Sequence, residues 1–272
     1  MDVGAVTAGA ATAGAATLFN GLVDDAGLFP PAALPMGEAL ARHERDLAAG
    51  SPVLTHVFLC PASRIGELGG APPKSIGLIV DKGALPDLAG LGVVSIDIPG
   101  EGTEPVVGAC LATGLPVYVE PTRSAPGWLE AVARLPLTPG LSAKVRCGGV
   151  TAELFPTPAE LGAFIAICVE GDLPFKATAG LHHAVRRYDP VLDVYRHGFL
   201  NLLLATCVAV EGGDPVAVLE SAEADELVRL ARAVPEETAS RARRLLVSYG
   251  SCSTSTPIED LRALGLIEEE NG

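Results

Sequence analysis

Eight short apolar runs alternate with helix-like segments along most of this chain, and this alternation constrains the fold more than any other feature. Each run is rich in Val, Ile, Leu or Phe and ends in polar or glycine residues, as buried β-strands do. The predicted strands are 22–25, 54–60, 76–81, 93–98, 116–120, 141–146, 174–178 and 245–251. The predicted helices are 37–49, 84–91, 104–113, 126–135, 158–170, several pieces within 190–244, and 257–264. Strands and helices in alternation predict a parallel sheet.

Eight such units favour an α/β fold of the (β/α)8 TIM-barrel type, with an open doubly wound sheet as the alternative. The length of 272 residues suits one barrel domain, which we place at 18–268. The connection between the seventh and eighth strands is far longer than a simple βα unit. We therefore expect extra helices inserted at about 186–244, and a flexible Ala/Gly/Thr-rich tail at 1–17.

Two helix starts are marked by the same local pattern. Thr157-Pro158-Ala-Glu160 and Thr256-Pro257-Ile-Glu259 each offer a threonine cap, a proline at the first helical position and a glutamate three residues after the cap. We expect helices to begin directly after both threonines.

Charge and cysteine content limit the partners. A net charge of −14 argues against nucleic acid and anionic membranes, because either would need a positive patch. The six cysteines form no C-x-x-C pair, which indicates free thiols in a reducing compartment and predicts a cytoplasmic protein. The longest apolar stretch, 199–210, is shorter than the roughly 20 residues that span a bilayer. We expect a small-molecule substrate as partner, and the sequence leaves homo-oligomer formation open.

The chain has only four lysines, and three of them, Lys82, Lys144 and Lys176, close predicted strands. Barrel enzymes carry their chemistry at the carboxyl ends of the strands. Residues two apart on a strand share a face, so Lys144 lies with Arg146, and Lys176 with Thr178. Crowded cations disfavour their charged forms, so we expect one lysine to lose its proton and form Schiff bases. The alternative is a buried ion network of these lysines with Asp97 and Glu120.

Three motifs lie at the ends of the last predicted strands: Lys144-Val-Arg-Cys-Gly148, Pro174-Phe-Lys176-Ala-Thr-Ala-Gly180 and Tyr249-Gly250-Ser251-Cys252-Ser253. In these motifs the chain, from about residue 93 to 262, resembles the class I aldolase barrels, most closely the deoxyribose-phosphate aldolase family. The resemblance implies that Lys144 forms the Schiff base, that Lys176 tunes it, and that Asp97 moves protons. The Gly-Ser loop would bind phosphate. Val-Arg-Cys stands where the family has Thr-Ser-Thr, and His182-His183 has no counterpart there.

The leading hypothesis is a lyase of the aldolase type that acts on a small carbonyl or phosphorylated substrate without a cofactor. Its expected catalytic residues are Lys144, Lys176, Asp97, Glu120 and His182. The expected substrate- or phosphate-binding residues are Arg146, Gly148, Gly149, Thr178, Gly180, Gly250, Ser251 and Ser253.

Two other functions fit the same chain. A divalent-metal-dependent lyase or isomerase would enolise a carbonyl substrate, with Asp24, Asp25, Glu120 and His183 as metal ligands. A barrel without catalysis would serve as a binding or assembly module. Cys147 and Cys252 also lie at strand ends, but the sequence indicates no histidine partner for either.

Overall fold

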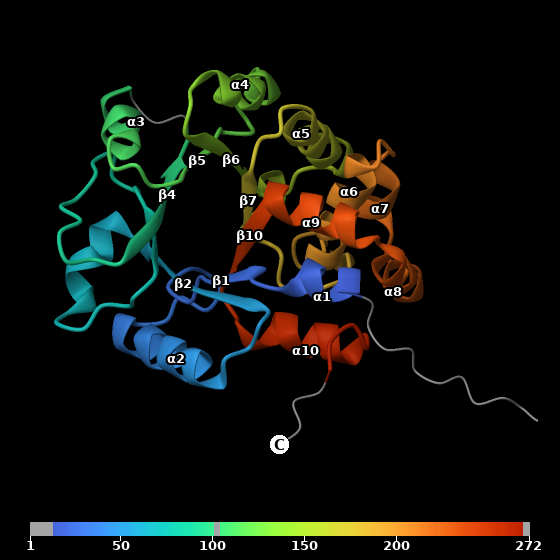
Figure 1. Cartoon of the computed structure of the whole chain (residues 1–272), viewed down its shortest axis with the longest axis horizontal. Coiled ribbons are helices and arrows are strands. Elements are labelled where there is room, and N and C mark those ends of the chain that lie inside the picture. Colours follow the sequence, from blue (N-terminus) through green and yellow to red (C-terminus); the bar gives the residue numbers. More distant parts are fainter. Residues whose placement is uncertain (1–12, 101–103, 269–272) are drawn as a thin grey trace, which may run out of the picture.

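The centre of the protein is a closed barrel of eight parallel strands (Figure 1). The structure is a computed structural model that describes residues 13–100 and 104–268. Around the barrel the strands follow the order β1-β10-β7-β6-β5-β4-β3-β2. Their bounds are β1 Val23–Asp25, β2 Leu54–Pro61, β3 Ile76–Ile79, β4 Val93–Pro99, β5 Val117–Glu120, β6 Leu141–Arg146, β7 Phe175–Thr178 and β10 Leu246–Ser251. The predicted (β/α)8 barrel is therefore confirmed, and the open-sheet alternative is wrong.

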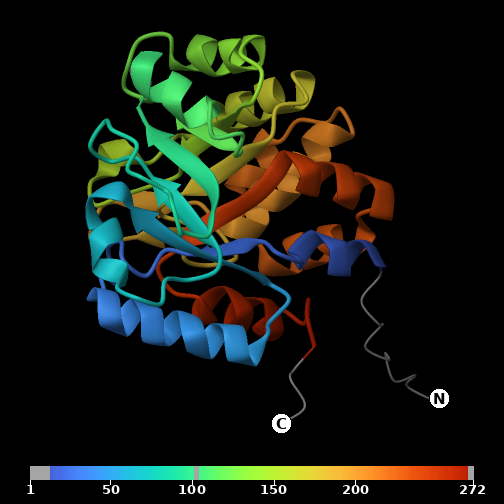
Figure 2. The same cartoon turned by 60° about the vertical axis from the view of Figure 1, so that its left-hand side comes forward.

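Helices surround the barrel on its outside (Figures 1 and 2). Those outside the insertion are α1 Ala13–Phe19, α2 Met36–Ala49, α3 Glu104–Leu111, α4 Trp128–Arg134, α5 Pro158–Glu170 and α10 Ser255–Ala263. The helix predicted at 84–91 is wrong, because turns and irregular backbone connect β3 to β4 there. Gly83 and Gly90 adopt φ angles of +65° and +76° at the ends of this segment, and Pro86 lies inside it. Left-handed glycines and a proline end a helix rather than propagate it.

The two predicted helix starts have different outcomes. At α5 the capping box is complete: Glu160 N donates to Thr157 Oγ1 at 3.1 Å, and Thr157 N donates to Glu160 Oε2 at 2.7 Å. At α10 the prediction is wrong, since the helix already begins at Ser255. Ser253 Oγ accepts a hydrogen bond from Thr256 N at 3.2 Å, so a hydroxyl three residues earlier satisfies this amide.

Helix α5 belongs to the core. Phe164 meets Phe175 of β7 edge to face at 5.3 Å between ring centroids, and Trp128 of α4 stacks on its other side at 6.2 Å. Leu161 and Ile165 are fully buried beside it. By length and composition alone, 152–170 is long and apolar enough to cross a membrane. Part of this segment is buried in the protein, including Leu161, Phe164, Ile165 and Cys168.

The insertion between β7 and β10 forms a hairpin followed by four helices. These are β8 Arg187–Asp189, β9 Val194–Arg196, α6 Phe199–Val210, α7 Val216–Glu220, α8 Ala224–Ala233 and α9 Glu236–Leu245. The first nine residues of α6 are buried. Asn201 joins three parts of the insertion: its Oδ1 accepts from Arg186 N at 2.8 Å, and its Nδ2 donates to Val218 O and Ser221 O. The extra helices are thus part of the packed protein.

The first and last barrel strands meet at a junction that also involves α1 and α9. The Arg243 guanidinium donates to Gly21 O at 2.8 Å, Asn20 O at 3.2 Å and Val247 O at 2.9 Å, and also to Leu246 O. Burial lowers the pKa of Arg243 to about 10. Helix α1 packs against α9 (Figure 2). Of the predicted tail, 13–17 form part of α1, and 1–12 lie outside the described residues.

Candidate functional site

The barrel interior holds a network of buried charges contributed by four strands. Lys144 on β6 and Lys176 on β7 are Cα partners in the strand register, so the two lysines lie side by side. Asp97 on β4 and Asp24 on β1 are each 1% exposed, and each lysine is 5% exposed. A closed barrel turns alternate residues of its strands inward, which explains how distant positions converge. Two cations and two carboxylates are therefore buried together in the barrel interior.

Lys144 is paired with Asp97. Its Nζ donates to Asp97 Oδ2 at 2.7 Å and lies 3.9 Å from Glu120 Oε2. Burial opposes ionisation of Asp97, but the ammonium groups of Lys144 and Lys176 outweigh it and lower its pKa. Asp97 Oδ1 is buried and has no hydrogen-bond partner among the described residues. An ionised carboxylate thus keeps one acceptor atom free beside the Lys144 amine.

Lys176 is held as a cation. Its Nζ donates to Asp24 Oδ2 at 3.1 Å and Ser95 Oγ at 3.2 Å, and lies 4.9 Å from the centroid of the Tyr118 ring. Burial opposes its charge, yet Asp24 and then Asp97 outweigh burial and raise the pKa of Lys176 above its ordinary range. Lys176 is therefore not the lysine that loses its proton, and the expectation of one neutral lysine stays a prediction for Lys144. Each buried lysine is paired with a carboxylate, Lys144 with Asp97 and Lys176 with Asp24, as the alternative of a buried ion network expects.

Asp24 completes this network instead of joining a metal site. It accepts hydrogen bonds from Ser248 Oγ at 2.8 Å and from Thr55 Oγ1 at 2.7 Å, in addition to Lys176. The sequence pattern missed this role, because Asp24 and Asp25 are adjacent and either could have faced the interior. Only the pairing of β1 with β10, which sets Asp24 beside Gly250, decides between them.

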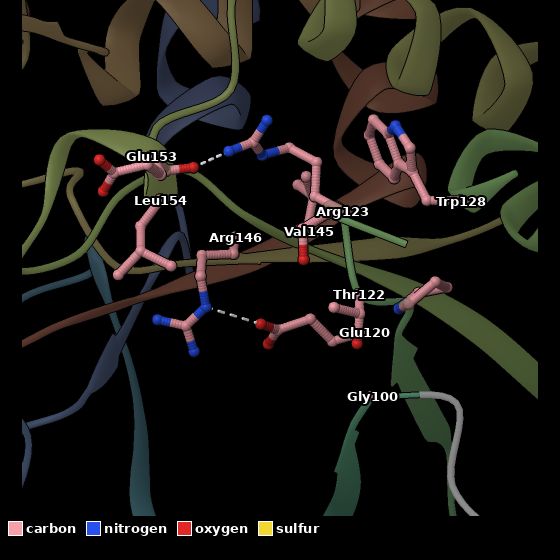
Figure 3. Close-up of a pocket in the computed structure, with 11 residues that line it drawn as sticks. Gly100, Glu120, Thr122, Arg123, Trp128, Val145, Arg146, Glu153 and Leu154 are labelled. Atoms are coloured by element: carbon pink, nitrogen blue, oxygen red, sulfur yellow. Dashed lines mark hydrogen bonds and ion pairs between the residues drawn. The ribbon is translucent and has the colours of Figure 1, made fainter. Parts of the chain in front are cut away.

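A pocket opens where β5 and β6 end (Figure 3). It has a volume of about 180 Å³, and its lining includes Glu120, Arg123, Trp128, Arg146, Glu153 and Leu154. Arg146 Nε donates to Glu120 Oε1 at 2.9 Å. The other oxygen of Glu120 faces the Lys144 amine at 3.9 Å. Glu120 therefore links the pocket to the buried lysine.

The two arginines of the pocket differ in how many of their terminal nitrogens are hydrogen-bonded to the protein. Both terminal nitrogens of Arg123 have partners: Nη1 donates to Glu160 Oε1 at 3.1 Å, and Nη2 donates to Glu153 O. Arg146 has a side chain that is 42% exposed. Figure 3 shows its two terminal nitrogens pointing away from Glu120. Arg146 is thus the cation of this pocket that is best placed to meet an anionic group.

The expected phosphate-binding glycines after β6 and β7 are packed against one another. A Cβ added to Gly148 would lie 2.8 Å from Gly180 Cα, and one added to Gly180 would lie 2.8 Å from Cys147 O. Gly180 also has φ +77°. Gly149 differs, because it packs on the Leu154 side chain. The close approach of two backbones accounts for glycine at positions 148 and 180.

The hydroxyl groups of the expected phosphate loop after β10 also form hydrogen bonds within the protein. Ser251 Oγ donates to Ser253 O at 2.6 Å, and Ser253 Oγ is 2.8 Å from Thr256 Oγ1. Gly250 packs on Leu59, and Thr178 is its register partner on β7. These contacts give the loop a structural role, and phosphate binding there stays a prediction.

The four side chains of the alternative metal site do not come together. Asp25 faces Arg42, His43 Nδ1 at 3.3 Å and Gly27 N at 2.9 Å. His183 Nδ1 contacts Asp260 Oδ2 at 3.1 Å. Asp24 and Glu120 belong to the lysine and arginine contacts described above. Across 13–100 and 104–268, no three side chains of His, Cys, Asp or Glu gather in a way that could hold a metal ion.

His182 contacts a cysteine rather than the lysine network. Its Nδ1 lies 3.4 Å from Cys252 Sγ. The neighbouring His183 turns to Asp260, so the two histidines have separate partners, as expected for adjacent residues. The sequence places both His182 and Cys252 after strands, but only the barrel order makes β7 and β10 neighbours. This pairing was therefore missed.

The comparisons with known proteins give no family. No family model matches the chain, and no curated protein matches it. Among solved structures it is similar to Yersinia pestis DHPS, determined with a pterine-sulfa conjugate, at 13% sequence identity and a TM-score of 0.45. The match covers 91% of this chain and 93% of that chain. A likeness at this level carries no argument about function, and the fold assignment rests on the strand order.

Proposed function

We propose that this barrel is an aldolase-type lyase that makes or breaks a carbon–carbon bond through a Schiff base between Lys144 and a small carbonyl substrate. The observation that carries the proposal is the contact of the Lys144 amine with Asp97 at 2.7 Å, beside an Asp97 oxygen that is buried and has no partner within 13–100 and 104–268. Catalytic groups in a buried interior of this kind favour proton transfer and charge stabilisation over binding alone.

In the first step Asp97 takes a proton from the Lys144 ammonium group to which it is hydrogen-bonded, and the amine then attacks the carbonyl carbon. A second proton moves from the nitrogen to the former carbonyl oxygen, which gives a carbinolamine. Asp97 returns its proton to this hydroxyl, which leaves as water and yields the iminium ion. Asp97 Oδ1, which has no partner among the described residues, is available for a hydrogen bond from the hydroxyl of the intermediate.

Lys176 acts as a positioning residue in this scheme. Its raised pKa keeps it charged, and its contacts with Asp24 and Ser95 fix the ammonium beside the reacting pair. A fixed positive charge stabilises electron density that develops on neighbouring oxygen atoms. Lys176 is therefore not a second nucleophile.

The pocket at the strand ends supports a substrate with an anionic group. Arg146 presents an exposed guanidinium, and Glu120 lies between it and Lys144. A planar guanidinium binds carboxylate and phosphate oxygens in pairs. With a volume of about 180 Å³, the pocket suits a substrate of few carbon atoms.

Reductive trapping tests the proposal. The protein is incubated with a panel of small aldehydes and ketones plus borohydride, and adducts are mapped by mass spectrometry. Lys74 and Lys82 are exposed and serve as internal controls for nonspecific modification. We expect an adduct on Lys144 that forms faster than those on the controls and is lost in Lys144→Arg. Trapping confined to Lys74 and Lys82 across the whole panel would overturn the proposal.

A further inference from the structure

A thiol and an imidazole meet at the carboxyl ends of two neighbouring strands, outside the lysine network. Cys252 follows β10 and His182 follows β7, and Cys252 Sγ lies 3.4 Å from His182 Nδ1. Cys252 is 7% exposed, whereas the other five cysteines are between 0% and 3% exposed. It is therefore the cysteine that solvent and small reagents reach most readily.

The imidazole is in the state that accepts a proton. Burial, together with the positive charges of Arg196, His183 and Arg187, lowers the pKa of His182. At neutral pH its ring is uncharged, and with the proton on Nε2 the Nδ1 lone pair faces the thiol. His182 can thus take the thiol proton when sulfur forms a bond to carbon.

A guanidinium and the start of a helix lie near Cys252. Arg42 Nη1 donates to Cys252 O at 2.7 Å, which holds a guanidinium beside this residue, although Arg42 also pairs with Asp25. Helix α10 begins at Ser255, three residues after Cys252. The first amides of a helix carry partial positive charge, so both features add positive charge to the surroundings of Cys252.

We propose that Cys252 and His182 form a nucleophilic pair that reacts with carbon electrophiles, independently of Lys144. The sulfur forms a bond to the electrophilic carbon, and the thiol proton passes to His182 Nδ1. With an alkyl halide the carbon–halogen bond breaks and halide leaves. With an aldehyde the carbonyl oxygen takes the proton back and gives a hemithioacetal, so that no further reactant is needed.

The other cysteines provide the contrast. Burial raises the pKa of Cys60 to about 11 and that of Cys207 to about 12, and it also raises the pKa of Cys110, Cys147 and Cys168. A thiol that stays protonated in an apolar core is inert. Selective reaction at one position of six is therefore expected.

Alkylation kinetics test the pair. The full chain is treated with iodoacetamide under native conditions, and the labelled cysteines are mapped by mass spectrometry over time. We expect Cys252 to be labelled about tenfold faster than any other cysteine, and His182→Gln to slow it about tenfold. His183→Gln is the matched control, because this neighbour contacts Asp260 and not the thiol, and it should change the rate far less than His182→Gln does.

Any of three outcomes would overturn the proposal. The first is that Cys252 is labelled no faster than Cys207. The second is that His182→Gln leaves the labelling rate of Cys252 unchanged, and the third is that Lys144→Arg slows this labelling as much as His182→Gln does. The last result would show that the thiol depends on the lysine site. Thermal melts of each variant establish that the compared proteins are folded.

Discussion

Replacing Asp24 by asparagine should leave the Lys176 ammonium buried beside a neutral amide. The Asp24–Lys176 contact is 3.1 Å between Oδ2 and Nζ, in side chains that are 2% and 6% exposed. At an effective dielectric constant of about 20, this attraction is about 5 kcal/mol. Asp97 also faces Lys176 and offsets part of the loss. Removing one partner of a buried ion pair lowers the free energy of unfolding by about 3–5 kcal/mol, and we expect a loss of about 3 kcal/mol here.

Thermal unfolding at pH 7 measures this effect. A loss of about 3 kcal/mol corresponds to a fall in Tm of about 6–12 °C for a chain of this size. Glu67→Gln is the control, since it removes an ion pair of similar length, 2.7 Å, at the surface, where no detectable change is expected. Adding Lys176→Met to Asp24→Asn removes the orphaned charge and should restore most of the Tm. A buried, stabilising Asp24–Lys176 pair is ruled out if Asp24→Asn lowers Tm no more than Glu67→Gln does, or if the double variant has no higher Tm than Asp24→Asn alone.

Two further predictions concern Asp97 and the packed glycines. The folded pKa of Asp97 is lowered, so its contribution to stability is present above the unfolded pKa and is lost as pH falls through the folded value. Asp97→Asn should therefore flatten the decline of Tm below about pH 4, and an unchanged decline would contradict this. Gly148→Ala should lower Tm, because its Cβ would lie 2.8 Å from Gly180 Cα, whereas Gly37→Ala on α2, which meets nothing within 4 Å, should raise it slightly. Equal melts for the two alanine variants would contradict the packing role.

The strands could be predicted because a buried parallel strand has a local signature. Val117–Glu120 and Leu141–Arg146 are short apolar runs bounded by polar residues and glycines, and both strands form where the pattern predicts. The segment at 84–91 failed because its apolar residues fit a helix while Pro86 and the flanking glycines oppose one. The spacing of apolar residues alone takes no account of the proline and the two glycines, which disfavour a helix.

Site residues could be predicted only where their position within a strand is visible in the local sequence. Lys144 and Lys176 were located because each ends an apolar run, and strand order made them neighbours. Their partners depend on which of two adjacent residues faces inward, and that choice is made by barrel closure. The contact of His182 with Cys252 likewise depends on two loops that are distant in the sequence. Long-range register, which no local pattern encodes, decides such contacts.

The junction of β1 with β10 has a consequence for how the chain is made. Val23 pairs with Tyr249, and arginines secure both ends of this junction: Arg243 near its start, and Arg42, which contacts Asp25 and Cys252, at the other end. During synthesis β1 emerges before every other strand of the barrel, and β10 emerges last. Without β10 the barrel cannot close, because β1 and β7 would each lack one neighbouring strand, and unpaired strand edges are prone to association with other chains. Closure is therefore a late, long-range event that the ribosome delays until the final strand is released.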